Sequence, residues 1–419
     1  MAGGDRGTPR RDARGGDVAR GSGVSRRTAV LLGCGVAALA GGAAVASRCA
    51  RVAGSSTRSS SDSSASGATL DQRVSQAVGS LTLEQKVAQM FMPTPEALTG
   101  VGQVTAAGET TRKAFASIPV GGLCYFSQNL IDPSQTKQML ASSDAISRDA
   151  VGLPLLMAVD EEGGTVSRIG GNDGFDVDNV GDMRDVGDAG DPQRAHDVCE
   201  GIAGYLSPLG FNLDLAPDAD IVSGTSQTMA RRSFGTSADV VAPMVGQAVR
   251  GFLDGGIMCC AKHFPGIGGA EGDSETEAIQ TTRTLDQMRG EELLPFEEAI
   301  RQGVPMVMVG HLSCPAVTGD STPASLSKAI VTDLLRDELG FDGIIITDSL
   351  QMGAVSGLYS ASELGVAAIQ AGVDMLLMTP SLGESYQGVL DAVSAGTLDK
   401  ARIDESVTRI VRAKLRYAS

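Results

Sequence analysis

Short apolar runs alternate with amphipathic stretches along the chain from about residue 70 onward. The apolar runs are rich in branched side chains and are bounded by Gly, Pro or polar residues, so they predict buried β-strands. Eight such strands are expected, at residues 87–92, 120–126, 153–159, 211–216, 257–261, 304–309, 343–347 and 375–378.

The stretches between these strands have the spacing of amphipathic helices. The helices expected are residues 134–148, 193–206, 239–253, 285–301, 328–339 and 362–370. A strand followed by a helix, repeated eight times over about 350 residues, favours a parallel barrel over a doubly wound sheet. We therefore predict an α/β fold, a (β/α)8 TIM-type barrel that forms a single catalytic domain over residues 70–419.

The first 69 residues follow a different pattern. A twin arginine at Arg26-Arg27 precedes the apolar stretch 28–47, which is typical of an export signal. Residues 1–52 are thus predicted to be a twin-arginine signal or a membrane anchor, with signal cleavage and lipid attachment at Cys34 both open. The Ser-rich residues 53–69 are predicted to be a linker. We expect the protein to be secreted or tethered to the outer face of the cytoplasmic membrane.

The charge of the chain is unevenly distributed. Residues 1–52 carry nine Arg and three Asp and so contribute +6. Because the net charge of the whole chain is −16, the remaining residues carry a net charge of −22. Nucleic-acid binding requires a basic surface that neutralises phosphates. The predicted barrel domain is therefore not expected to bind nucleic acid, and its acidic surface is consistent with solubility.

Cysteine usage gives no indication of a metal site. Of seven cysteines, Cys34 and Cys49 lie in the predicted signal, while Cys124, Cys259 and Cys260 fall inside predicted strands. Thiols in such runs are expected to be buried. The spacings typical of zinc sites and of phosphate-binding loops are missing from the sequence. We predict no metal, nucleotide or flavin cofactor.

Polar residues follow several of the predicted strands directly. Asp160 follows residues 153–159, Lys262 and His263 follow 257–261, and Asp348 follows 343–347. The C-terminal ends of barrel strands meet at one mouth, where TIM-barrel active sites lie. The sequence therefore predicts a shared site, to which further strand-end residues also belong: Glu161, Glu162, Asp218, Asp220 and His311, with Arg168 and Arg232 nearby.

Some of these residues also have structural interpretations. Asp348 could cap a helix that begins near Ser349, and His311 could be a hydrogen-bonded core histidine. Lys262 is harder to explain in this way, because an ammonium beside a buried strand needs an acceptor that offsets its desolvation. A carboxylate or a polar ligand would provide one.

Six ordered motifs between residue 81 and about residue 354 resemble those of a known family. They are Val120-Gly121-Gly122-Leu123, Val159-Asp160-Glu161-Glu162-Gly163-Gly164, Leu215-Ala216-Pro217-Asp218-Ala219-Asp220, Arg232-Ser233-Phe234-Gly235, Lys262-His263-Phe264-Pro265-Gly266 and Gly340-Phe341-Asp342-Gly343 followed by Thr347-Asp348-Ser349. The chain is similar to the barrel domain of family 3 glycoside hydrolases. Within that family it most resembles the single-domain bacterial β-N-acetylhexosaminidases.

The resemblance implies a role for each matched position. Asp348 would be the nucleophile that forms a covalent glycosyl-enzyme, with net retention. The sugar-holding residues would be Asp160, Arg168, Arg232, Lys262 and His263. The implied activity is removal of terminal N-acetylglucosamine from glycans or cell-wall fragments, with a carbohydrate as the partner. A β-glucosidase or xylosidase specificity remains an alternative.

Two positions depart from the pattern that the resemblance implies. A His is expected where Ile267 stands, and an Asp-x-His dyad is expected where Asp273-Ser274-Glu275 stand. The chain thus keeps Asp273 but has Glu275 in place of the acid/base histidine. A glutamate can protonate a leaving group, and its acidic neighbours would raise its pKa, with Glu271 as a further candidate acid. Alternatively Glu275 is only surface charge, and the protein is an exported, non-catalytic sugar-binding protein.

Overall fold

Eight short parallel strands form the centre of the fold. The structure is a computed structural model that describes residues 68–222, 227–270 and 278–418. Each of the eight predicted strand regions coincides with one of these strands: β1 (Phe91–Met92), β2 (Gly122–Tyr125), β3 (Leu156–Val159), β4 (Leu213–Asp214), β5 (Met258–Phe264), β7 (Met306–Val309), β9 (Ile344–Thr347) and β10 (Leu376–Leu377). β5 runs beyond its predicted end at residue 261, because Phe264 still pairs with Val309 of β7, so Lys262 and His263 lie inside the strand. A separate parallel pair, β6 (Ile279–Gln280) and β8 (Leu312–Ser313), was not predicted.

The pairing order closes these strands into a barrel. One sheet has the order β2-β3-β4-β5-β7-β9, and β10 pairs with β1. A parallel bridge between Ile346 and Met375 links β9 to β10. On the other side, Gly121 N–H donates to the Phe91 carbonyl at 3.0 Å, which links β1 to β2. The predicted (β/α)8 barrel is therefore confirmed, and every pairing places the C-terminal strand ends at the same mouth.

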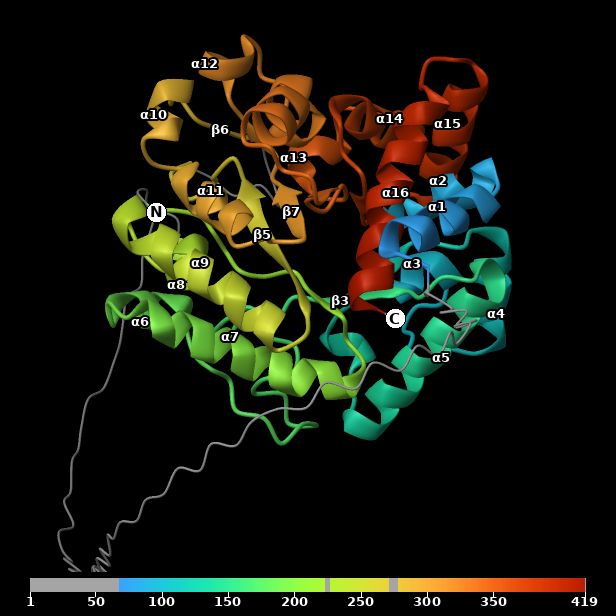
Figure 1. The fold of residues 1–419 in the computed structure, drawn as a ribbon, viewed down its shortest axis with the longest axis horizontal. Helices are drawn as coiled ribbons and strands as arrows, with labels where there is room; N and C mark the ends of the chain where they lie inside the picture. The colour runs from blue at the N-terminus through green and yellow to red at the C-terminus, as the bar shows by residue number, and fades with distance from the viewer. Residues whose placement is uncertain (1–67, 223–226, 271–277, 419) are drawn as a thin grey trace, which may run out of the picture. The chain divides into compact units, whose positions relative to one another are not determined.

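Helices surround the strands (Figure 1). The main ones are α1 (Leu70–Ser80), α2 (Leu83–Gln89), α4 (Glu109–Ser117), α5 (Pro133–Val151), α7 (Pro192–Leu206), α9 (Ala238–Asp254), α11 (Leu294–Arg301), η4 (Ala329–Glu338), α14 (Ala361–Ala371), α15 (Leu382–Ser394) and α16 (Lys400–Tyr417). Short helices lie in the loops: α3 (Pro95–Thr99), α6 (Met183–Asp188), α8 (Gln227–Arg232), α10 (Leu285–Arg289), α12 (Pro315–Thr318) and α13 (Gly353–Ser356), with the 3-10 turns η1 (Ser127–Asn129), η2 (Ser207–Leu209) and η3 (Ala324–Leu326).

Local sequence signals explain where these helices begin and end. Before α5, the Asp132 side chain accepts a hydrogen bond from Gln135 N–H at 2.9 Å, and Pro133 occupies the first turn. The same helix ends at Gly152, whose φ of 72° suits a residue without a Cβ. These are the N-cap and C-cap signals expected of an amphipathic helix.

The structure corrects two further predicted elements. Residues 87–89 belong to α2 and not to the first strand, because Thr82 and Gln85 form a capping box that starts a helix at Leu83. The helix predicted over 285–301 is two helices, α10 and α11. Gly290 ends the first one, and Pro295 lies in the first turn of the second. Both errors arose from reading apolar content without its capping residues.

A buried carboxylate ties α16 to the barrel. Asp374 precedes β10, is fully buried, and accepts hydrogen bonds from Arg336 at 2.7 Å, Arg402 at 3.0 Å and Arg409 at 3.2 Å. Ile345 N–H donates to it as well, at 3.0 Å. Asp374 thus links η4, β9 and α16. Burial alone would raise the pKa of Asp374, but the three guanidinium groups hold it below its usual value.

The described part of the chain confirms the expected burial of three cysteines but does not include the predicted export signal. Five cysteines are buried free thiols, as expected for Cys124, Cys259 and Cys260: Cys124, Cys199, Cys259, Cys260 and Cys314. Among the helices of residues 68–418 outside the gaps, none is both long and apolar enough to cross a membrane. The predicted export signal over residues 1–52 and nearly all of the predicted linker over 53–69 lie outside the described residues.

Candidate active site

A pocket of about 410 Å³ opens at the C-terminal ends of the barrel strands. Side chains from β5 and from the turns after β3 and β9 line it, together with residues of later loops. The polar lining residues are Asp160, Glu162, Arg168, Arg232, Lys262, His263, Asp348, Ser349 and Gln351. All six sugar-holding and nucleophile residues expected from the sequence therefore lie in one cavity.

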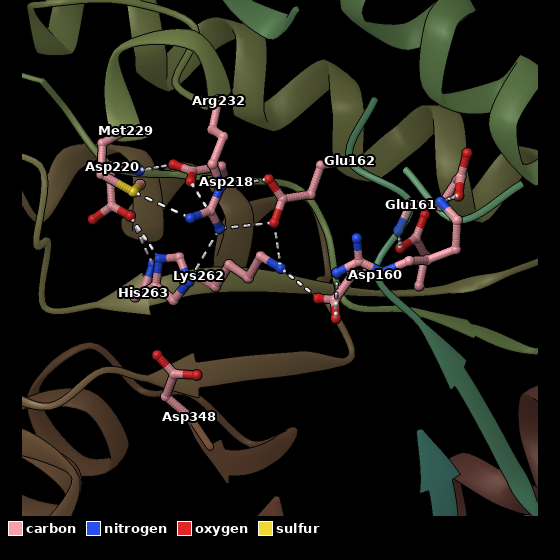
Figure 2. A network of polar contacts seen from close by, with 12 residues as sticks. Asp160, Glu161, Glu162, Asp218, Asp220, Met229, Arg232, Lys262, His263 and Asp348 are labelled. Atoms are coloured by element: carbon pink, nitrogen blue, oxygen red, sulfur yellow. Dashed lines mark hydrogen bonds and ion pairs between the residues drawn. The ribbon is translucent and has the colours of Figure 1, made fainter. Parts of the chain in front are cut away.

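Lys262 is the centre of a buried ion-pair chain (Figure 2). Its Nζ atom lies 2.9 Å from Asp160 Oδ1 and 2.6 Å from Glu162 Oε1, and the residue is only 2% exposed. Burial would lower the pKa of Lys262, but the charges of Asp160 and Glu162 more than offset this and raise it. The ammonium therefore stays charged, and these are the acceptors that the sequence required.

Arg232, at the end of α8, extends the same chain. Its Nε and Nη2 atoms donate to the two oxygens of Glu162, at 2.7 and 2.8 Å. Despite burial, the charges of Lys262 and Arg232 lower the pKa of Glu162 below its usual value. Glu162 is thus a fixed carboxylate that holds two cations at the pocket wall, and its fork contact with Arg232 orients the guanidinium.

His263 is held from behind by Asp220. The His263 Nδ1 atom lies 2.8 Å from Asp220 Oδ2, and His263 N–H donates to the same oxygen at 3.2 Å. Burial would lower the pKa of His263, but the hydrogen bond to Asp220 raises it. Consecutive strand residues normally point to opposite faces. The register between β5 and β7 shifts between Ala261 and Phe264, and both Lys262 and His263 line the pocket.

Arg168 comes from the loop after β3, and Glu161 fixes that loop. The Glu161 carboxylate is fully buried and accepts hydrogen bonds from the backbone N–H groups of Arg168, Ile169 and Gly170 at 2.5, 2.9 and 2.8 Å. Tyr205 donates its hydroxyl to the same carboxylate, at 2.9 Å. The Arg168 guanidinium lies 5.5 Å from the Phe126 ring centroid and 3.9 Å from Asp160 Oδ2.

Replacing Glu161 with Gln is expected to loosen this loop. The amide NH2 would face backbone donors, so at least one buried N–H loses its acceptor, at a cost of about 1–3 kcal/mol in the free energy of unfolding. KM should rise, because Arg168 is no longer held in place. Urea unfolding and steady-state kinetics measure the two effects. Tyr205→Phe is the matched control, because it removes one donor from the same carboxylate and should cost about 1 kcal/mol. Equal stability of Glu161→Gln and wild type would contradict the assignment.

Asp348 reaches the pocket from the end of β9, apart from the ion-pair chain (Figure 2). Its backbone N–H donates to the Val309 carbonyl at 2.9 Å, and its Oδ1 atom accepts from Ser349 N–H at 2.7 Å. Burial would raise the pKa of Asp348, but the nearby His263 and the hydrogen bond from Ser349 N–H lower it below its usual value. The carboxylate is therefore ionised at neutral pH, as a nucleophile must be.

Three buried residues, one of which lines the pocket, have the donor atoms of a metal site. Ligand atoms of Asp218, Asp220 and His263 all lie within 4.8 Å of one another. The pair of Asp220 and His263 is already hydrogen-bonded, however, and the Arg232 guanidinium lies 3.8 Å from Asp218 Oδ2. A cation there would meet that guanidinium at close range. We therefore assign Asp220 to holding His263, with Asp218 beside Arg232.

Asp218 differs electrostatically from its neighbours. Burial and the adjacent charge of Asp220 raise the pKa of Asp218 to about 8. Its Oδ1 atom accepts from Asp220 N–H at 2.9 Å, while Oδ2 is buried without a hydrogen-bond partner in the described part of the chain. A protonated Asp218 avoids placing a second negative charge beside Asp220.

The sequence predicted most of the polar lining but not the roles of two residues. Glu162 and Asp220 were placed in the predicted site without a role, and the structure shows that Glu162 binds both cations and that Asp220 fixes His263. The available signal was their position in the segments that follow strands β3 and β4. The predicted acid/base candidates Asp273 and Glu275, together with Glu271, lie outside the described residues.

Comparison with known protein families assigns residues 82–413 to the profile described as the glycosyl hydrolase family 3 N-terminal domain. Among curated proteins, the chain is similar to the β-hexosaminidase LpqI of Mycobacterium tuberculosis, with 36% identity over 276 residues, 62% of this chain and 68% of that protein. It is also similar to a β-hexosaminidase of Chromobacterium violaceum, with 35% identity over 276 residues, 64% of this chain and 74% of that protein.

Solved structures give the same result. A family 3 β-N-acetylglucosaminidase from Paenibacillus sp. FPU-7 superposes with a TM-score of 0.76 at 36% sequence identity. The match covers 81% of this chain and 63% of that one, so the chain spans less than two thirds of that enzyme. M. tuberculosis LpqI superposes with a TM-score of 0.69 at 32% identity, which covers 80% of this chain and 94% of that one.

Proposed function

Because the chain belongs to glycosyl hydrolase family 3, and is thus a glycoside hydrolase, we propose that it is a retaining, exo-acting β-N-acetylhexosaminidase. The observation that carries this proposal is the shared pocket. An ionised Asp348 faces the same cavity as the side chains Asp160, Arg168, Arg232, Lys262 and His263. Sugar hydroxyls are neutral groups that need such a dense set of charged donors and acceptors.

In the proposed mechanism, Asp348 attacks the anomeric carbon of a terminal sugar that the charged cluster holds. The C–O bond to the leaving group breaks, and its oxygen takes a proton from an acid. Water then attacks the glycosyl-enzyme, with the former acid acting as base, so that two displacements give net retention. The name of the Paenibacillus enzyme, a β-N-acetylglucosaminidase, supports N-acetylglucosamine as the sugar.

The acid/base group is proposed to be Glu275, with Asp273 as its partner in the same loop. Retaining glycosidases generally use two carboxyl groups, and the acidic neighbours of Glu275 favour a protonated form. The departure at Ile267 and Glu275 also favours a second candidate function, an exported sugar-binding protein without turnover. We further propose that residues 1–52 direct export, that 53–69 form a linker, and that 70–419 form the catalytic domain.

Hydrolysis of aryl glycosides tests the proposed function. The folded protein should release nitrophenol from aryl N-acetyl-β-D-glucosaminide faster than from the matching β-glucoside and β-xyloside. NMR of the first product should show the β-anomer. Faster hydrolysis of the glucoside or xyloside would overturn the specificity, while sugar binding without hydrolysis of any of the three would support the binding protein.

Replacing Glu275 with Ala tests whether Glu275 protonates the leaving group. Activated aryl glycosides need little leaving-group protonation, so their glycosylation should be almost unchanged, whereas kcat/KM on a natural disaccharide should fall by about 10²–10⁴-fold. Parallel assays on chitobiose and a dinitrophenyl glycoside measure the difference. Glu277→Ala, a neighbouring carboxylate, is the matched control and should change neither rate. An equal effect on both substrates would remove Glu275 from the mechanism.

A further inference from the structure

His311 lies two residues beyond β7 and is 1% exposed. Its Nε2 atom is 2.9 Å from the Ser349 carbonyl oxygen, and its Nδ1 atom is 2.8 Å from Ser325 Oγ. A carbonyl can only accept a hydrogen bond, so Nε2 carries the proton and the Ser325 hydroxyl donates to Nδ1. Burial lowers the pKa of His311, which keeps the ring in this neutral tautomer.

Ser349 connects His311 to the nucleophile. The N–H group of Ser349 donates to Asp348 Oδ1 at 2.7 Å, while its carbonyl accepts from His311. The backbone N–H of Asp348 is itself bound to the Val309 carbonyl at 2.9 Å. The end of β7 and the turn after it thus hold the nucleophile residue through its backbone and, by way of Ser349, through its carboxylate.

The same turn also packs against the sugar-holding strand. A Cβ atom at Gly310 would lie 3.1 Å from His263 Cβ and 3.2 Å from Ile267 Cγ2, so the backbone of this turn packs closely against β5 and its loop. Ser325 N–H donates to the Gly310 carbonyl at 3.2 Å, which ties η3 to the turn. The segment from Val309 to His311 therefore lies between the strand that carries His263 and the turn that carries Asp348.

We propose that His311 is a positioning residue that sets the place of the Asp348 carboxylate relative to the bound sugar, through its hydrogen bond to the Ser349 carbonyl. The inference rests on the proposed function, in which Asp348 must reach an anomeric carbon. A nucleophile has to lie within about 3–3.5 Å of the atom it attacks, and a displacement of about 1 Å can cost about 10²-fold in rate.

His311 does not act as the acid or base itself. Both ring nitrogens are occupied by protein partners, and His311 is not among the residues that line the pocket. The charged groups that act on it are Asp348, directly after β9, and His263 in β5. A neutral histidine with both nitrogens engaged has no proton to exchange with substrate.

Two substitutions at His311, which introduce amide side chains of different length, test the proposal. The amide of Gln reaches about as far as Nε2, so His311→Gln can still donate to the Ser349 carbonyl, whereas the shorter His311→Asn cannot. We expect His311→Asn to lower kcat by about 10²-fold with KM little changed. The loss should be equal on activated and natural substrates, and His311→Gln should recover most of it.

The pH profile provides a readout that loss of packing alone would not move. The Ser349 N–H bond helps to lower the pKa of Asp348, so loosening Ser349 should move the acid limb of kcat/KM to higher pH in His311→Asn. Ser325→Ala removes the donor to Nδ1 and should show a smaller shift in the same direction. Ser313→Ala is the control from the same connection, because it removes only a hydrogen bond to the Ser321 carbonyl.

The outcomes separate the two proposals. Equal kcat values for wild type and folded His311→Asn, or for the Asn and Gln variants, would overturn the role of His311 while the proposed function stands. If the acid limb of kcat/KM is unchanged in Ser325→Ala, this result counts against the role of His311 even if His311→Asn fails to fold. A wild-type protein without hydrolysis of any aryl glycoside would overturn the proposed function, and the role of His311 with it.

Discussion

Replacing Asp348 with Asn is expected to lower kcat/KM on every substrate, activated or natural, by about 10⁴–10⁶-fold, the scale on which loss of a catalytic nucleophile acts. The substitution keeps the shape of the side chain and its acceptor for Ser349 N–H, but it removes the charge that attacks the sugar. Fold and sugar affinity should persist, because the ion-pair chain around Lys262 does not include Asp348.

Steady-state kinetics over a pH range checks this prediction. The pKa of Asp348 is lowered, so the nucleophile stays ionised below the usual range of an aspartate, and the acid limb of wild-type kcat/KM should lie below about pH 4. The matched control is Asp342→Asn, an exposed carboxylate just before the start of β9, which should behave as wild type. More than trace activity in folded Asp348→Asn would mean that another residue is the nucleophile.

Replacing Asp374 with Asn should have the largest effect on stability. It leaves the guanidinium groups of Arg336, Arg402 and Arg409 around a neutral amide, and breaking such a buried network typically costs about 3–5 kcal/mol. Chemical denaturation monitored by circular dichroism measures the loss. Asp149→Asn is the control, because its ion pair with Arg112 is exposed on both sides and should contribute about 0–1 kcal/mol.

The pH dependence of stability gives a second check on Asp374. Its pKa is lower in the folded than in the unfolded chain, so its contribution is fully present above about pH 4 and is lost as pH falls toward the folded value. Wild type should therefore lose more stability than Asp374→Asn over this acid range. Parallel pH profiles of the two proteins would contradict the assignment.

The sequence predicted the barrel because its eight strands are each short, apolar and buried. Such strands leave the same pattern whatever their neighbours, so the sequence also placed Asp160 and Asp348 directly after β3 and β9, whereas Lys262, predicted to follow its strand, lies inside β5. The sequence did not predict which side chains contact each other. That Glu162 binds both Lys262 and Arg232 depends on loop geometry, and nothing in the local sequence distinguishes Glu162 from Glu161.

The two neighbouring glutamates show this limit most clearly. Both follow β3, and both are buried, yet Glu162 faces the pocket while Glu161 accepts three backbone N–H groups of the loop that carries Arg168. His311 is a similar case. The sequence allowed two interpretations of His311, a core histidine or a residue of the site. The structure shows a core histidine that is hydrogen-bonded to Ser349, which in turn donates to Asp348.

Trapping of the glycosyl-enzyme tests the central claim most directly. A fluorinated N-acetylglucosaminyl donor with a good leaving group needs a nucleophile but little acid catalysis, so it can label the protein whether or not Glu275 acts as the acid. Peptide mass spectrometry should locate one fluorosugar on Asp348, and no label should appear on Asp348→Asn. Labelling of another residue, or neither labelling nor hydrolysis by the folded wild-type protein, would contradict the claim that Asp348 is the nucleophile of a retaining glycosidase.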